Sequence, residues 1–198
     1  MLAIYLMDEI RSFIAIEVPQ VVKVKIEELQ RELRRTDADA KWVRPEGIHL
    51  TLKFLGSIRQ EDVEKICQAI APLVSLWEPF EIRIHGMGGF PSSRNPRVLW
   101  VGLDRGNGEV HSLQQAIERK LAELSFLPED RPFSPHLTLG RVRSSRGKSG
   151  LAQVLDKNKE VEVGNFRAGE IFLFRSELKP SGAVYTKLKD FPMRESSK

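Results

Sequence analysis

Two short segments of this sequence present a histidine and a threonine in the same arrangement. Both read HLTL, the first starting at His49 and the second at His136, a little under half the chain further on. An imidazole has an unperturbed pKa of about 6.5, so at neutral pH one copy can accept a proton while another donates one. Two such rings facing each other across a cleft can activate a nucleophile on one side of a phosphorus atom and protonate a leaving oxygen on the other.

The residues that follow each histidine fit a strand with one polar and one apolar face. Alternation along a β-strand places His49 and Thr51 on one face. The opposite face then comprises Leu50, Leu52 and Phe54. The second motif repeats this pattern, with Thr138 beside its histidine. The two threonine hydroxyls can donate hydrogen bonds to non-bridging phosphate oxygens as charge develops on them.

Three further residues complete the candidate site or border it. Arg141 lies three residues after Thr138, and its planar guanidinium suits phosphate oxygens. Lys53 shares the face of His49 by alternation, and we expect a surface lysine there. Phe90 lies in the glycine-rich stretch 86–91, which lacks the lysine and hydroxyl pair of a nucleotide-binding loop. We expect that stretch to be a loop bordering a cleft, with Phe90 available to stack on a base.

Zinc is the competing explanation of two histidines. A zinc site needs three or four ligands, and no carboxylate or cysteine accompanies either motif in a recurring pattern. We therefore expect no metal. His85 and His111 have no matching partner and are expected at the surface, and Cys67 is expected to pack against the core on a helix.

The elements around the two motifs recur in the same order: strand, helix, histidine-bearing strand, helix, strand. Strand-like runs at 12–18 and 98–104 open the two halves, and apolar stripes with helical spacing follow each of them. The stripes comprise Val22, Ile26, Leu29 and Leu33; Val63, Ile66, Ile70 and Leu73; and Leu113, Ile117, Leu121 and Leu124. A weaker helix is expected over 149–158, and closing strands over 80–85, 161–163, 171–174 and 184–188. The repeat predicts one α+β domain with pseudo-twofold symmetry, its lobes taking residues 10–95 and 96–192.

Composition narrows the class of protein. The 198 residues are 41% hydrophobic and 29% charged, which is typical of a soluble globular domain and excludes a disordered chain. The single cysteine excludes a disulfide framework and fits a reducing cytosol. Asp8, Glu9 and Arg11 interrupt the apolar opening segment, so it predicts neither a membrane span nor a secretory signal. We therefore expect a cytoplasmic protein.

The charge balance favours a phosphate-bearing partner. The formal net charge is +4 and the sequence pI is about 9.3. A basic protein attracts phosphates through long-range steering and counterion release. The basic stretch 143–148 is expected to face solvent, with contact to an RNA backbone as the alternative.

The sequence resembles the 2H phosphoesterase superfamily, and more narrowly the RNA 2′,3′-cyclic phosphodiesterases, which are also called 2′-5′ RNA ligase-like proteins. The similar segments occur in order along nearly the whole chain: RSFIAIEVP, HLTLKFLG, GGFPSSRNPRVLWVGL and FSPHLTLGRV. Residues 1–6 precede the part that resembles the usual start, which makes Met7 a candidate initiator.

The resemblance implies a bilobal α+β fold with two antiparallel sheets, outer helices and a central V-shaped cleft. It also implies hydrolysis without metal, ATP or cofactor. The implied substrate is an RNA end or nucleotide with a 2′,3′-cyclic phosphate, which water opens to a 2′-phosphomonoester. In these roles His49 protonates the departing O3′ and His136 activates the water. Thr51, Thr138 and Arg141 hold the phosphate, and the enzyme is expected to be a monomer.

Other activities remain open on the sequence alone. The nearly symmetric lobes allow the two histidines to exchange the roles of acid and base. Hydrolysis or ligation of 2′-5′ phosphodiesters, and action on small cyclic nucleotides, would use the same residues. A non-catalytic protein that binds RNA ends is the alternative from a different class.

Overall fold

The computed structural model describes residues 9–180 and 182–194, so the candidate start at Met7 lies outside the described residues. The strands are β1 (Glu9–Glu17), β2 (Ala40–Trp42), β3 (His49–Arg59), β4 (Phe80–Phe90), β5 (Val98–Arg105), β6 (Leu137–Val142), β7 (Glu162–Ala168), β8 (Glu170–Lys179) and β9 (Gly182–Pro192). The helices are α1 (Gln20–Arg34), α2 (Gln60–Val74), α3 (Asn107–Ala122) and α4 (Lys148–Lys157), with a short 3-10 helix, η1 (Pro45–Gly47).

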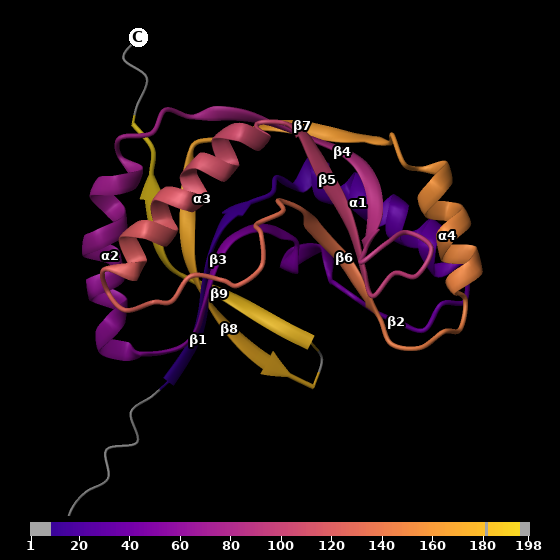
Figure 1. The fold of residues 1–198 in the computed structure, drawn as a ribbon, viewed down its shortest axis with the longest axis horizontal. Helices are drawn as coiled ribbons and strands as arrows, with labels where there is room; N and C mark the ends of the chain where they lie inside the picture. The colour runs from indigo at the N-terminus through magenta and orange to yellow at the C-terminus, as the bar shows by residue number, and fades with distance from the viewer. Residues whose placement is uncertain (1–8, 181, 195–198) are drawn as a thin grey trace, which may run out of the picture.

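The strands form two antiparallel sheets. Sheet A has the strand order β3-β1-β8-β9, and sheet B has the order β2-β6-β5-β4-β7. Helices α2 and α3 lie at one end of the molecule, and α4 lies at the other (Figure 1). Two antiparallel sheets with four helices confirm the α+β fold that the sequence predicts.

Each sheet takes strands from both halves of the sequence. In the first half, β4 pairs with β5 and β7 and so belongs to sheet B. In the second half, β8 pairs with β1, and β9 extends sheet A beyond it. The ranges 10–95 and 96–192 remain a prediction from the sequence repeat, and the sheets are built by an exchange of strands across that division.

The apolar stripes of the helices bury the core. Helices α2 and α3 contact sheet A through β3 and β9, while α1 and α4 contact sheet B through β7 and β4. Most members of the predicted stripes are fully buried, and Leu29, Val63, Leu73 and Leu124 are partly buried against the same core. Burial of such side chains contributes about 25 cal/mol per Å² of apolar surface, which makes these stripes the main support of both sheets.

The sequence predicted a loop over the glycine-rich stretch 86–91. This prediction is wrong, because residues 86–90 belong to β4. Gly88 lies directly opposite Trp100 of β5. A Cβ atom at Gly88 would lie 2.4 Å from the indole ring of Trp100. The glycine therefore lets a large ring lie across the neighbouring strand, so its function is packing rather than phosphate binding.

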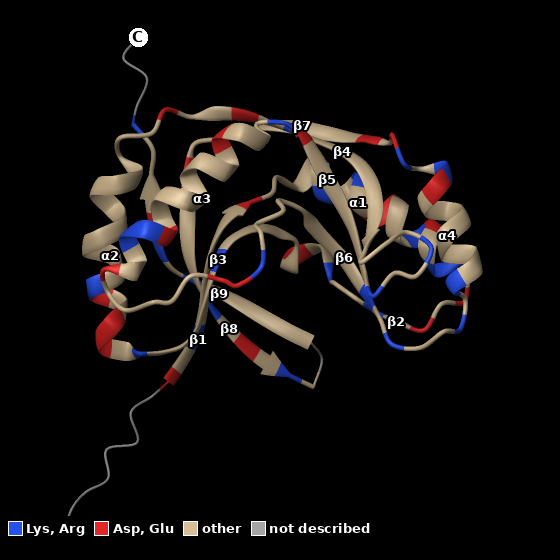
Figure 2. Cartoon of the chain, in the orientation of Figure 1, with Lys and Arg blue, Asp and Glu red and all other residues tan. Residues whose placement is uncertain are grey.

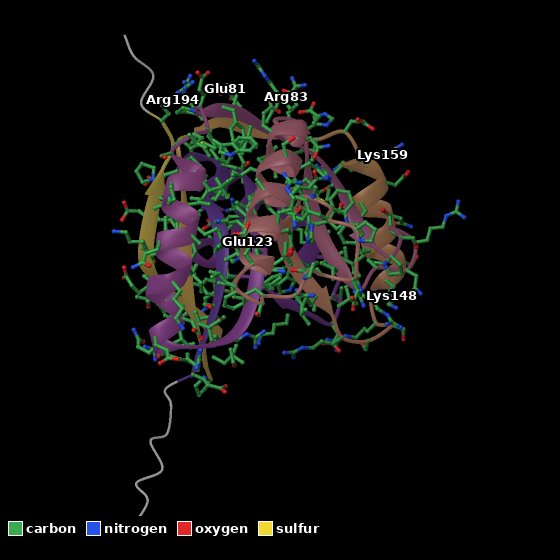
Figure 3. All side chains as sticks on the ribbon, turned by 60° about the vertical axis from the view of Figure 1, so that its left-hand side comes forward. Glu81, Arg83, Glu123, Lys148, Lys159 and Arg194 are labelled. Atoms are coloured by element: carbon green, nitrogen blue, oxygen red, sulfur yellow. The ribbon has the colours of Figure 1, made fainter. Side chains whose placement is uncertain are left out.

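Charged residues lie mainly around the outside of the molecule (Figure 2). Glu81, Arg83 and Arg194 lie along one edge, and Lys148 and Lys159 lie on the outward side near the two ends of α4 (Figure 3). Within the described residues, no helix is both long and apolar enough to cross a membrane. Basic segments also occur where β6 ends and in the turn that leads to α4 (Figure 2).

Candidate active site

His49 begins β3 and is held between aromatic rings of sheet A. Its ring stacks on Phe13 of β1, with ring centroids 4.5 Å apart. Tyr185 of β9 meets the same imidazole edge-on, with centroids 5.1 Å apart and planes at 90°. Because one ring covers its face and another its edge, the orientation of His49 is defined by packing. The side chain remains half-buried, so part of it is accessible to solvent.

His136 immediately precedes β6 and has a comparable aromatic neighbour in sheet B. Phe90 of β4 meets its imidazole edge-on, with centroids 5.1 Å apart. The Nδ1 atom of His136 lies 2.7 Å from the carbonyl oxygen of Ser134. A carbonyl only accepts hydrogen bonds, so Nδ1 carries the proton and Nε2 is left to accept one. His49 likewise hydrogen-bonds the backbone of Gly47, two residues upstream.

The two histidine-bearing strands meet although they belong to different sheets. Strands β3 and β6 contact each other near the middle of the molecule (Figure 1). The buried amide of Gln30, on α1, donates to the carbonyl oxygens of Val43 and Leu139, both at 2.8 Å. The backbone N–H of Val43 also donates to the Leu139 carbonyl at 3.0 Å. These bonds join the chain just upstream of His49 to the strand that carries Thr138.

A β-bulge in each strand changes the expected faces. Along β3 the pairing with β1 skips Leu52, so Thr51 and Phe54 lie on the same face as Phe13. Along β6 the pairing with β5 skips Leu139, so Thr138 and Arg141 share a face in the same way. An extra residue in a strand reverses the alternation beyond it, which explains both results.

Two expectations about β3 are therefore wrong. Phe54 does not lie on the buried apolar face, because its side chain is 54% exposed and its ring is near Phe13. Lys53 is not a surface lysine, because it turns toward the core and is 2% exposed. The position in β6 that corresponds to Lys53 is Gly140, and the position that corresponds to Phe54 is Arg141.

The polar groups predicted to bind phosphate lie on this part of the molecule. Thr51 and Thr138 are half-buried, and Arg141 is exposed. Lys41 of β2 is the direct cross-strand neighbour of Arg141. Like charges opposite each other on a sheet repel, and an anion between them relieves that repulsion. Within the described residues Arg141 has no ion pair, so its guanidinium is available to such an anion.

The surroundings of both histidines lower the affinity of the rings for a proton. Burial lowers the pKa of His49 to about 4; the Gly47 backbone opposes this effect, and the charge of Lys23 adds to it. Burial also lowers the pKa of His136, with the Ser134 carbonyl opposing and Arg141 adding. Both rings are therefore neutral at neutral pH in the unliganded protein. A bound anion near Lys23 or Arg141 would offset these positive charges and favour protonation.

This arrangement predicts how His49 titrates. In the free protein its NMR ring-proton signals should move with a midpoint near pH 4, well below the ordinary 6.5, and inorganic phosphate should raise that midpoint. Between those two values the unfolded chain binds more protons than the folded one, so the free energy of unfolding should fall as the pH falls through this range. Comparison with His49→Gln assigns the signals. A midpoint near 6.5 without phosphate would contradict the burial of His49.

Several residues of this site were not predicted from the sequence. Phe13, Tyr185 and Lys23 surround His49, and Gln30 joins the two strands. Phe13 and Ala15 alternate along β1 and belong with Phe172 and Phe174 to a separate apolar cluster. An aromatic residue on an alternating strand is the one available signal, and it does not distinguish the face of the site from the face of the core.

The other sequence candidates lie elsewhere or have structural contacts. His85 lies 3.9 Å from Asp104. His111 is half-buried rather than free at the surface, and its two ring nitrogens lie 2.9 Å and 3.2 Å from the carbonyl oxygens of Asn107 and Phe133. Cys67 is half-buried against the core. Among the described residues, no cluster of three or more His, Cys, Asp or Glu side chains could hold a metal ion.

Two antiparallel sheets that bring matched His-x-Thr motifs to adjoining strands define a phosphoesterase-like architecture. The family described as LigT like Phosphoesterase matches residues 16–100 and, a second time, residues 101–185. This chain belongs to the LigT-like phosphoesterase family.

Relatives and solved structures agree with that assignment. An RNA 2′,3′-cyclic phosphodiesterase of Methanothermobacter thermautotrophicus is 37% identical over 184 residues, which cover 92% of this chain and 98% of that protein. The protein of that name from Methanocaldococcus jannaschii is 33% identical, over 91% of this chain and 99% of its own length. The crystal structure of TT0787 of Thermus thermophilus superposes with a TM-score of 0.78 at 31% identity, covering 94% of this chain and all of that one.

Proposed function

We propose that this chain is an RNA 2′,3′-cyclic phosphodiesterase that hydrolyses a 2′,3′-cyclic phosphate at an RNA end to a 2′-phosphomonoester. The observation that carries the proposal is the pair of matched His-x-Thr motifs on β3 and β6, two strands that contact each other from different sheets. The relatives named for this activity span nearly the whole chain, which supports the same conclusion. The two sheets would enclose the substrate in a V-shaped cleft.

His136 would act as the base and His49 as the acid. Nε2 of His136 accepts a proton from water, and the water oxygen attacks the phosphorus as the P–O3′ bond breaks. The imidazolium of His49 donates its proton to O3′, which leaves as a hydroxyl group. The bond between Nδ1 of His136 and Ser134 supports the role of base, because it leaves Nε2 free. His49 would become an acid when the negative charge of the bound substrate raises its pKa.

The remaining residues would bind the substrate. Thr51 and Thr138 would donate to the non-bridging oxygens, one from each sheet, and Arg141 would neutralise the developing charge. Phe90 stays a candidate for stacking on a base, although its ring already contacts His136 and Trp100. One chain supplies both motifs, so the reaction would need neither a second subunit nor a metal ion. The enzyme would then act as a monomer, in the cytoplasm.

The test is hydrolysis of a nucleoside 2′,3′-cyclic phosphate in the presence and absence of EDTA. We expect the 2′-phosphate as the product and the same rate with the chelator, because the proposed acid and base are imidazoles. Loss of turnover with EDTA that Zn²⁺ or Mg²⁺ restores would contradict the metal-free mechanism. Release of a 3′-phosphate would show that the P–O2′ bond breaks, and would contradict the proposed departure of O3′. Cleavage of a 2′-5′ linkage alone would redirect the proposal to another phosphodiester. Binding of the substrate without turnover would point to a non-catalytic binder of RNA ends.

A further inference from the structure

Lys53 has an unusual environment for a lysine. The side chain is 2% exposed, and its Nζ atom lies 2.8 Å from Glu118 of α3 and 2.6 Å from the carbonyl oxygen of Leu127. Removing a lysine and a glutamate from water costs free energy that a single ion pair often fails to recover. Gly140 occupies the corresponding position in β6, so the β-strand itself does not require a cation there. The lysine therefore needs an explanation other than the formation of the sheet.

The bond to Leu127 reaches the segment that leads to His136. Residues 123–136 run from the end of α3 to this histidine without regular secondary structure. A cavity of about 430 Å³ lies between α3 and this segment, lined by residues including Pro128, Glu129 and Phe133. Leu124, Phe126 and Phe133 pack against the core, but the part of the segment that borders the cavity is not packed against α3, so polar contacts there contribute to its position.

These contacts come from β3 and α3. The carbonyl oxygen of Leu127 accepts from Lys53, and the carboxylate of Glu129 accepts from the backbone N–H of Phe54 at 3.4 Å. The carbonyl oxygen of Phe133 lies 3.2 Å from Nε2 of His111. The contacts to Leu127 and Glu129 both start on β3, the strand that begins with His49.

We propose that Lys53 is a positioning residue, which fixes the segment 123–136 against β3 and so holds His136 in register with His49. This inference rests on the proposed function, since it assigns His136 a role in the reaction. The strand that carries His49 would then bind, at the residue directly after Leu52, the segment that ends at His136. The Glu118 carboxylate would orient the ammonium group of Lys53 toward the Leu127 carbonyl.

Three variants separate positioning from stability. Lys53→Met combined with Glu118→Leu replaces the buried pair with apolar side chains, which is often neutral or stabilising, but leaves Leu127 without its donor. Glu118→Gln does the reverse, because it removes the ion pair and leaves the bond from Lys53 to Leu127. Lys53→Met alone removes both. Lys25→Met is the matched control, since Lys25 forms an exposed ion pair with Glu28 within α1, away from this segment.

We expect the double variant to unfold near the wild-type temperature, yet to lose kcat by about 10- to 100-fold, the effect of a small misplacement of a reacting group. Its KM should change little, and a glutamate-specific protease should cleave it faster after Glu129. Glu118→Gln should be less stable with nearly normal kcat. If kcat instead follows stability across the three variants, or if the double variant has normal kcat, Lys53 has no positioning role. Full activity of His136→Ala would instead refute the proposed function.

Discussion

Alanine in place of either His49 or His136 is expected to lower kcat for a nucleoside 2′,3′-cyclic phosphate by about 10²- to 10⁴-fold. The physical reason is that neither water nor solvent acid can replace an imidazole whose position is set by neighbouring rings. His49 is held by Phe13 and Tyr185, and His136 is held by Phe90 and the Ser134 carbonyl. KM should change much less than kcat, because the threonines and Arg141 remain to bind the phosphate.

The double variant makes this prediction specific to a coupled pair. If the two rings act in one step, the combined replacement should cost little more than the worse of the single replacements. His85→Ala is a suitable control, since His85 lies beside Asp104 and outside the proposed site. Steady-state rates with the purified variants are the measurement, with circular dichroism to verify folding. Undiminished turnover in either single variant would remove that histidine from the mechanism.

The sequence predicted the main elements and the paired motifs because these depend on local patterns. An apolar stripe such as Val22, Ile26 and Leu33 specifies a buried helix face wherever the helix packs. Finding the same His-x-Thr pattern twice is likewise independent of the tertiary arrangement. The order of strands in the two sheets could not be predicted from the sequence. The pattern of each strand allows several partners, so it does not specify that β4 joins sheet B while β8 and β9 join sheet A.

The errors in the site have one physical source. Alternation predicts faces only while a strand remains regular, and the bulges at Leu52 and Leu139 break it. Beyond the bulge Lys53 turns to the core and Phe54 turns outward, contrary to both expectations. Arg141 reaches the face of Thr138 for the same reason, although an odd separation of three residues would place them on opposite faces. No residue type in either strand predicts a bulge.

The bulges next to Thr51 and Thr138 also determine where the two threonine hydroxyl groups lie. Thr51 lies opposite Ala15 on β1, and Thr138 lies opposite Trp100 on β5, so each hydroxyl lies on the same face of its sheet as the site aromatics. Thr51→Val and Thr138→Val keep the shape of the side chain and remove only the hydroxyl group. We expect each to lower kcat by about 10²- to 10³-fold, the usual effect of losing one donor to a developing oxyanion.

The outcome of these valine variants tests whether the hydroxyl groups act on the transition state. A donor to an oxygen whose charge increases during reaction should affect kcat more than KM, whereas a donor that binds substrate and transition state equally should affect KM alone. Thr186→Val, at an exposed position of β9 in sheet A, is the matched control for loss of a strand hydroxyl. Equal kcat for Thr51→Val, Thr138→Val and the control would show that neither hydroxyl stabilises the transition state, and would leave Arg141 as the main group that binds the charge.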